Sequence, residues 1–366
     1  MSVPQRYDSP RINAHATAWT RLSELLHWLL IFGLIFALGM SLSVLIDTLL
    51  GIIMDFDLPH NLNLLTAFAL GIFATAVVQS STAISIATIY FVSAGTVETS
   101  VAVFIIFGIN LGTTLSPLLL SNIFPGNIAA KKASLLHVLF NTCGLLIAIP
   151  LELSFQPFSQ LAQALSPAIG SFSTHSFSAA PWLSVGKHSI MASIAIIMGC
   201  SFLAVLCIRL IATLSARIVA GTGFGILERA GNLGTSIGLA AGALVTILVG
   251  TSSTTVTAVT AMASRRCLSE RVSLAVIIGA NMGTTISGIF VSFSLSHTSP
   301  AALHVALVHV LFNVVIAFLV LLIPQLRFGL MRLADYCAHL MQRHFFLSNL
   351  VLFLVWFAIP AALFLT

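Results

Sequence analysis

The chain has 366 residues, of which 58% are hydrophobic and only 7% are charged, whereas ordinary soluble domains carry roughly 25% charged residues. So much apolar surface must be solvated by lipid, which excludes a soluble globular protein. The apolar runs are long rather than alternating, which excludes a β-barrel. The net charge of +5 comes from Lys and Arg at the ends of apolar segments, so it marks membrane topology rather than nucleic-acid binding. We therefore predict an all-α polytopic membrane protein.

A first membrane repeat is predicted over 25–153, after a polar tail at 1–24. Its spans and interrupted segments are expected, in chain order, at 25–54, 64–94, 101–121 and 133–153. Polar residues interrupt two of these segments, at Gln79-Ser80-Ser81-Thr82 and at Asn110–Thr114. Residues 154–187 are rich in Ser, Phe and Pro and lack a long apolar run, which predicts an external loop.

A second membrane repeat is predicted over 188–325, with a terminal part at 326–366. Its spans and interrupted segments are expected at 188–212, 236–264, 272–296 and 301–323. The interruptions are at Thr251-Ser252-Ser253-Thr254 and at Asn281–Thr285. Charges at near-helical spacing over 327–346 predict an amphipathic surface helix, and the last residues predict a final span.

The two halves repeat the same motifs at a constant offset. Ser80 and Ser252 are 172 residues apart, and His-Val-Leu-Phe-Asn occurs twice, beginning at His137 and at His309. Each interruption by Ser-Ser-Thr precedes a segment Gly-x-Asn-x-Gly-Thr-Thr by about thirty residues. A duplicated half with polar breaks at matching places is typical of a secondary transporter.

The positions of the basic residues favour a topology in which 64–94 and 236–264 are re-entrant hairpins. In that arrangement the basic residues all lie on the side of the N-terminal tail, with the exception of Lys187. If both segments crossed the membrane, the basic loop at 265–271 would lie on the opposite side from its basic neighbours. We therefore predict two inverted-topology repeats, each with a re-entrant helical hairpin and a broken helix, and a cytoplasmic N-terminus.

The interruptions are the candidate binding site, because a helix broken in hydrocarbon leaves N–H and C=O groups without partners. Half-helix N-termini attract anions, and carbonyls at half-helix C-termini suit a sodium ion. We expect Ser81 or Thr82, Thr113 or Thr114, Ser253 or Thr254, and Thr284 or Thr285 to cap the half-helices. Gly108, Gly112, Gly279 and Gly283 are expected to let the backbone bend and approach a ligand.

The repeated His-x-x-x-Asn places His137 with Asn141, and His309 with Asn313, on one helix face. A buried polar brace between helices is favoured over a substrate or proton contact. Asp47 is the only carboxylate well inside a predicted span. Because proton-driven pumps usually carry an intramembrane carboxylate relay, the sequence favours sodium coupling.

At these residues the chain resembles the type II sodium/phosphate cotransporter family, over roughly 64–153 and 231–325. That family carries Gln-Ser-Ser motifs in both repeats, and Thr251 stands where the second Gln would be expected. The resemblance implies phosphate binding by Ser80, Ser81, Ser252, Ser253, Thr114 and Thr285. It implies that the sodium sites are shaped by Gln79, Thr82, Asn110, Thr113, Thr251, Thr254, Asn281 and Thr284, with structural support from His137, Asn141, His309 and Asn313.

The expected function is sodium-coupled symport of inorganic phosphate by alternating access, with sodium as coupling ion and no cofactor. The alternatives are transport of another oxyanion, phosphate export, a passive anion channel, and an intramembrane phosphatase or lipid-phosphate enzyme. An enzyme would need an Arg–carboxylate cluster at mid-depth, which the predicted spans lack. The expected location is the plasma membrane, the inner membrane of a bacterium, with a homo-oligomer left open.

Overall fold

The computed structural model describes residues 62–123, 126–173, 234–295 and 299–365, and a few isolated residues elsewhere. The spans predicted at 25–54 and 188–212 lie outside these ranges, apart from isolated residues. All regular secondary structure in the described part of the chain is helical. Five helical segments there are long and apolar enough to cross a membrane: Thr99–Asn122, Ile128–Phe155, Glu270–Phe293, Pro300–Leu322 and Phe345–Leu363. The prediction of an all-α membrane protein is therefore confirmed.

The first interruption separates α2 (Leu64–Val78) from α3 (Ser81–Ser93). Gln79 ends α2 in a left-handed conformation, with φ at 59°. The Ser80 hydroxyl then caps α3 by accepting a hydrogen bond from the backbone N–H of Ala83. The cap is therefore Ser80 rather than the predicted Ser81 or Thr82, because α3 begins two residues earlier than expected.

The interruption in the second half separates α10 (Thr235–Val249) from α11 (Ser252–Ser264). Gly250 ends α10 with φ at 80°, where a residue without Cβ is favoured. Thr251 is the N-cap residue of α11 and makes no side-chain cap bond. The prediction of Ser253 or Thr254 as the cap is wrong, since both lie inside the helix.

Glycines hold α4 (Thr99–Gly112) against α2, and α12 (Glu270–Leu295) against α10. A Cβ added at Gly108 would lie 2.1 Å from the carbonyl oxygen of Phe68, and one at Gly279 would lie 2.0 Å from that of Leu239. Such close backbone contacts tolerate only glycine. These glycines, with Gly112 and Gly283, serve helix packing, which corrects the expectation that they let the backbone bend toward a ligand.

The segment Gly-x-Asn-x-Gly-Thr-Thr is broken in the first half and helical in the second. α4 ends at Gly112 and α5 (Leu115–Ile123) begins after Thr113 and Thr114. In contrast, α12 continues through 281–285, so the break predicted there and the capping by Thr284 or Thr285 are wrong. The cause lies downstream: Pro117 provides no N–H for the carbonyl of Thr113, whereas the equivalent Gly288 provides one for Thr284.

The long helices α6 (Ile128–Phe155) and α13 (Pro300–Leu322) are each followed by an amphipathic helix. These are α7 (Pro157–Ser173), which packs on α13, and α14 (Pro324–Arg343), which packs on α6. The predicted loop at 154–187 is therefore helical over much of its first half. The buried carboxylate of Glu152 makes that helix possible, because it accepts hydrogen bonds from the first free N–H groups of α7, those of Phe158 and Ser159.

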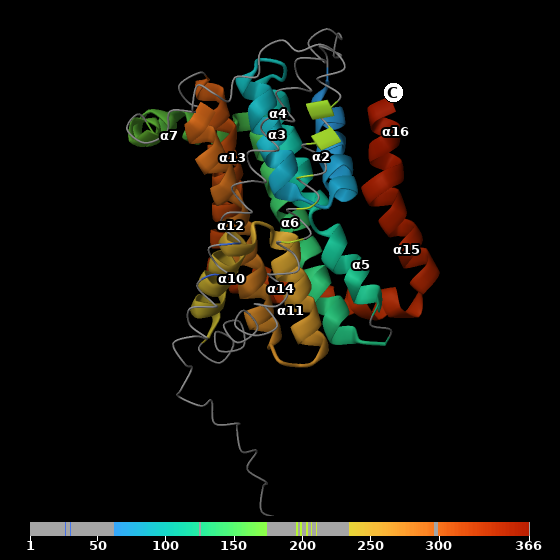
Figure 1. The fold of residues 1–366 in the computed structure, drawn as a ribbon. Coiled ribbons are helices and arrows are strands. Elements are labelled where there is room, and N and C mark those ends of the chain that lie inside the picture. The colour runs from blue at the N-terminus through green and yellow to red at the C-terminus, as the bar shows by residue number, and fades with distance from the viewer. Residues whose placement is uncertain are drawn as a thin grey trace, which may run out of the picture.

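The chain ends in one long helical segment made of α15 (Phe345–Phe353), a π-helical turn (Leu354–Ala358) and α16 (Ile359–Leu365). It runs beside α2 and is the predicted final span (Figure 1). Figure 1 also shows the α2–α3 pair in the upper part of the molecule and the α10–α11 pair in the lower part. This placement brings the two interruptions toward the middle of the molecule.

Candidate functional site

The tips of the two helix pairs touch each other. The hydroxyl of Thr82, in the first turn of α3, donates a hydrogen bond of 2.7 Å to the carbonyl oxygen of Gly250, at the end of α10. This bond joins residues 168 positions apart. It also supplies a donor to one of the carbonyls that the end of α10 leaves without an intrahelical partner.

Thr113, in the break between α4 and α5, is the centre of a cluster of buried hydroxyls. Its Oγ1 lies 2.9 Å from Oγ of Ser253, and 3.4 Å from Oγ of both Ser252 and Ser81. The Ser253 hydroxyl is also within donating distance of the carbonyl oxygen of Thr113, at 3.2 Å. All four side chains are buried. Residues from three interruptions therefore meet at one point, and each contributes a neutral hydroxyl.

The first residues of α3 and α11, and the residues just before α5, all lie at this cluster. Three helix N-termini therefore point their free N–H groups and positive dipole ends toward the same region. The C-termini of α2 and α10 end beside it, at Gln79 and Gly250. The arrangement places anion-binding N–H groups next to cation-binding carbonyls.

The neighbouring predicted site residues differ in how far they are engaged. Gln79 is exposed; its amide donates to the carbonyl of Ala76 and its oxygen accepts from the hydroxyl of Ser116. The buried Oγ1 of Thr251 has no hydrogen-bond partner among the described residues. Thr254 is exposed. Within the described residues, the Thr251 hydroxyl therefore has a hydrogen-bonding capacity that no protein group uses.

Three predicted site residues direct their hydroxyls back to their own helix. Thr284 donates to the carbonyl of Ala280 at 3.1 Å, and Thr285 donates to that of Met282 at 2.7 Å. Thr114 donates to the carbonyl of Leu111 at 2.7 Å. Such local bonds are common for hydroxyls in membrane helices, and they leave Thr113 as the threonine of these segments that contacts the serines.

The repeated His-x-x-x-Asn motifs contact the asparagines of the other half. Nε2 of His137 lies 3.0 Å from Oδ1 of Asn281, whose amide nitrogen donates to Oδ1 of Asn141 at 3.2 Å. In the mirror position, Asn313 donates to Oδ1 of Asn110 at 3.2 Å. These buried contacts between α6 and α12, and between α13 and α4, are those of a polar brace.

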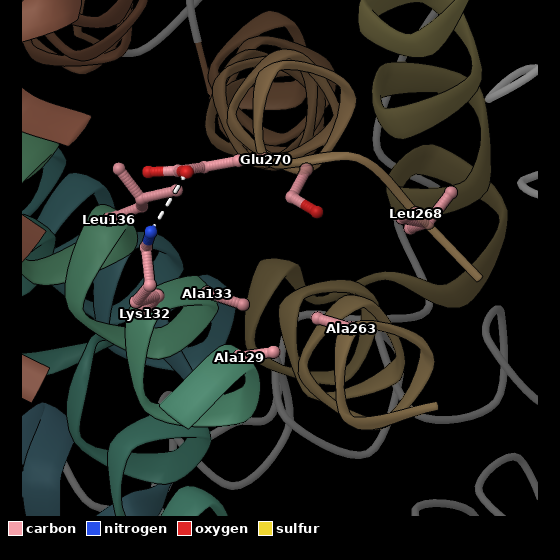
Figure 2. Close-up of a pocket in the computed structure, with 8 residues that line it drawn as sticks. Ala129, Lys132, Ala133, Leu136, Ala263, Leu268 and Glu270 are labelled. Carbon is pink, nitrogen blue, oxygen red and sulfur yellow. Dashed lines mark ion pairs between the residues drawn. The ribbon is translucent and has the colours of Figure 1, made fainter. Parts of the chain in front are cut away.

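A second polar region lies between α6, α11 and α12, where a cavity of about 100 Å³ is lined by residues such as Lys132, Glu270 and Ser273 (Figure 2). Nζ of Lys132 lies 3.0 Å from Oε2 of Glu270 and 2.9 Å from Oδ1 of Asp335 on α14. The hydrogen bond from Lys132 holds the pKa of Asp335 below its ordinary value. One ion pair attaches α14 to α6, and the other joins α6 to α12.

No group of three or more His, Cys, Asp or Glu side chains in the described ranges could hold a metal ion. Sequence reasoning missed Pro117, which provides no N–H for the carbonyl of Thr113 at the break. Its signal was present in the difference between Leu-Ser-Pro at 115–117 and Ile-Ser-Gly at 286–288.

The described helices and the duplicated sequence motifs are those of a helical membrane protein. The profile of the Na+/Pi-cotransporter family matches residues 29–166 and 203–334, which is most of the chain. The protein therefore belongs to the Na+/Pi-cotransporter family, which connects it with the cotransport of sodium and phosphate across a membrane. Comparison with curated proteins and with solved structures gives no match.

Proposed function

We propose that this protein is a sodium-coupled symporter of inorganic phosphate, with phosphate bound between the tips of α2–α3 and α10–α11. The observation that carries the proposal is the hydroxyl cluster, in which Thr113 contacts Ser81, Ser252 and Ser253 from two distant parts of the chain. A phosphate oxyanion accepts hydrogen bonds, and hydroxyls with the N–H groups of converging helix starts donate them. Ser80, at the N-cap of α3, completes the proposed phosphate set.

Sodium is proposed to bind beside phosphate, on oxygens at the ends of α2 and α10. The carbonyl of Gly250 and the hydroxyls of Thr82 and Thr251 lie there, together with the side chain of Gln79. The amides of Asn110 and Asn281 are bonded within the braces. We propose that these two residues act on the sodium sites by fixing α4 and α12.

Alternating access is supported by the packing of helices of one half on helices of the other half. α3 of the first half packs on α13 of the second, and α11 of the second half packs on α6 of the first. A core in which equivalent helices cross between halves is what an inverted pair of repeats would form. Opening one tip from the cluster, and then the other, would expose phosphate to each side in turn. We propose further that the N-terminus lies in the cytoplasm and that the protein resides in the plasma membrane.

The decisive experiment measures uptake of radiolabelled phosphate into proteoliposomes with and without an inward sodium gradient. Ser81→Ala and Ser253→Ala are each expected to abolish sodium-dependent uptake while the protein still inserts. Ser292→Ala is the matched control, since Ser292 is a buried serine whose hydroxyl bonds to its own helix at Ile289. If both site variants transport as the parent does, the site assignment is wrong.

The same assay separates the alternatives. Competition by sulfate, arsenate or dicarboxylates would identify another oxyanion as substrate, and phosphate efflux driven by sodium would identify an exporter. Uptake that needs no sodium and never runs uphill would identify a channel. Release of phosphate from a lipid phosphate would identify an enzyme.

A further inference from the structure

The last helical segment of the chain touches the break between α4 and α5, although the family match ends at residue 334. Nε1 of Trp356 donates a hydrogen bond of 3.1 Å to the carbonyl oxygen of Leu111. Trp356 is only 4% exposed, whereas most of its neighbours in α15 face outward. Leu111 lies two residues before Thr113, and its carbonyl also accepts hydrogen bonds from the N–H and the hydroxyl of Thr114, at 3.1 Å and 2.7 Å. Trp356 therefore adds a bond from outside to the turn that carries Thr113.

The chain places Trp356 there by a local distortion of the helix. Pro360 provides no N–H for the carbonyl of Trp356, and the helix widens into a π-helical turn over Leu354–Ala358. A single widened turn changes which side chains face inward from that point on. Here it accompanies the burial of Trp356, which with Leu352 and Pro360 is buried in a segment whose other described side chains are exposed or half-buried.

The same segment makes a second polar contact, at the other end of α5. Nδ2 of Asn122 donates to Oδ1 of Asn349 at 3.0 Å. The terminal segment therefore bonds to the chain at both ends of α5, before it through Leu111 and at its end through Asn122. Residues 345–365 lie along α5 and α2 in Figure 1, which agrees with these two bonds.

We propose that the C-terminal helix clamps the broken helix α4–α5 and that Trp356 is a positioning residue for Thr113. The proposal rests on the proposed function, because it makes Trp356 act on the phosphate site through Thr113. A broken helix lacks the hydrogen bonds that would fix the direction of its two parts. The clamp adds two external bonds, one before α5 and one at its end. α12 is continuous, so its own backbone hydrogen bonds hold its two parts in line. The second half therefore needs no equivalent external contact.

The test is Trp356→Phe, which keeps an aromatic ring and removes the N–H donor. Its KM for sodium-driven phosphate uptake is expected to rise about fivefold, the effect of losing one hydrogen bond, while the maximal rate and the thermal stability in detergent stay near those of the parent. Asn349→Ala is expected to raise KM in the same direction. Phe346→Leu is the matched control, because Phe346 lies in the same helical segment and is 88% exposed.

The proposal is overturned if Trp356→Phe has the KM of the parent, if Phe346→Leu raises KM equally, or if stability falls and KM does not change. A second readout does not depend on transport. In a protein with Trp19, Trp28 and Trp182 replaced by Phe, the emission maximum of Trp356 is expected to shift when Thr113 is replaced by Val. If the parent takes up no phosphate but this shift is present, the proposed function is wrong and the clamp remains. If the shift is absent, the clamp is wrong.

Discussion

The two copies of Gly-x-Asn-x-Gly-Thr-Thr have the same letters and different structures. The first copy ends α4 at Gly112 and leaves Thr113 in a break, while the second lies inside the continuous helix α12. Both copies pack equally closely on their neighbours, through Gly108 on α2 and Gly279 on α10. The difference therefore does not arise from the motif. It follows from the fourth residue after the threonine, Pro117 in one copy and Gly288 in the other.

This comparison shows that the duplicated motif sets how the helices pack, and that a single proline sets where the helix is broken. Where the helix is broken, the hydroxyl and the carbonyl of Thr113 are both turned to Ser253. Where it is continuous, the hydroxyl of Thr284 bonds back to Ala280. The two halves are therefore alike as a scaffold and unlike at the site, so mutations in the two halves should have equal effects in the scaffold and unequal effects at the site.

The largest expected effect comes from placing a proline in the second copy. Gly288→Pro removes the N–H that supports the carbonyl of Thr284 in the middle of α12, and should lower the free energy of unfolding by about 3 kcal/mol or more. Thermal unfolding in detergent measures this. Gly288→Ala is the control, since it keeps the N–H and its Cβ would meet only the side-chain tip of Ile89, at 3.2 Å. If the proline variant melts as the alanine variant does, proline does not explain the break in the first copy.

The next prediction tests whether the two halves pack their helices equally closely. Gly108→Ala and Gly279→Ala each push a Cβ against a backbone carbonyl oxygen, and each should destabilise the protein by about 1–3 kcal/mol. Thermal unfolding should show similar losses for both. Gly329→Ala is the control, because a Cβ there would meet nothing within 4 Å. A large loss for one glycine and none for the other would contradict the matched packing.

Replacing Thr113 or Thr284 by valine is expected to change stability less, but only the first replacement is expected to reduce transport strongly. Thr113→Val removes the hydroxyl that joins Ser81, Ser252 and Ser253, and leaves buried hydroxyls without a partner, so phosphate uptake should fall at least about tenfold. Thr284→Val removes a hydroxyl that bonds only to its own helix, and uptake should stay within about threefold of the parent. Initial rates at equal protein content in the vesicles compare the two. Equal losses would show that both copies serve the site.

Much of this structure could be predicted from the sequence, and most of the failures come from contacts between distant residues. The interruptions at Gln79–Thr82 and Thr251–Thr254 were predictable because several consecutive polar residues rarely continue an apolar helix. The break at Asn281 was wrongly predicted because Gly288 provides the N–H that Pro117 lacks in the first copy. The side chains of Asn281 and Thr284 also find partners in α6 and in α12 itself. Partners of this kind are tertiary or local contacts that no single sequence displays. The contact of Trp356 with Leu111 was unpredictable for the same reason, as the two residues are 245 positions apart.

The smallest expected effect concerns how each half holds its amphipathic helix. Glu152 holds α7 from inside the protein, whereas α14 is held by an ion pair between Lys132 and Asp335, whose side chain is 48% exposed. The hydrogen bond from Lys132 lowers the pKa of Asp335 in the folded protein, so this stabilisation is present above the ordinary pKa of an aspartate and is lost as the pH falls through the lowered value. Asp335→Asn should therefore melt slightly below the parent near neutral pH, and the two should converge in acid. Glu98→Gln, at an exposed carboxylate without an ion pair in the described residues, should show no such convergence. A difference between parent and Asp335→Asn that persists unchanged into acid would mean that the charge of Asp335 does not attach α14.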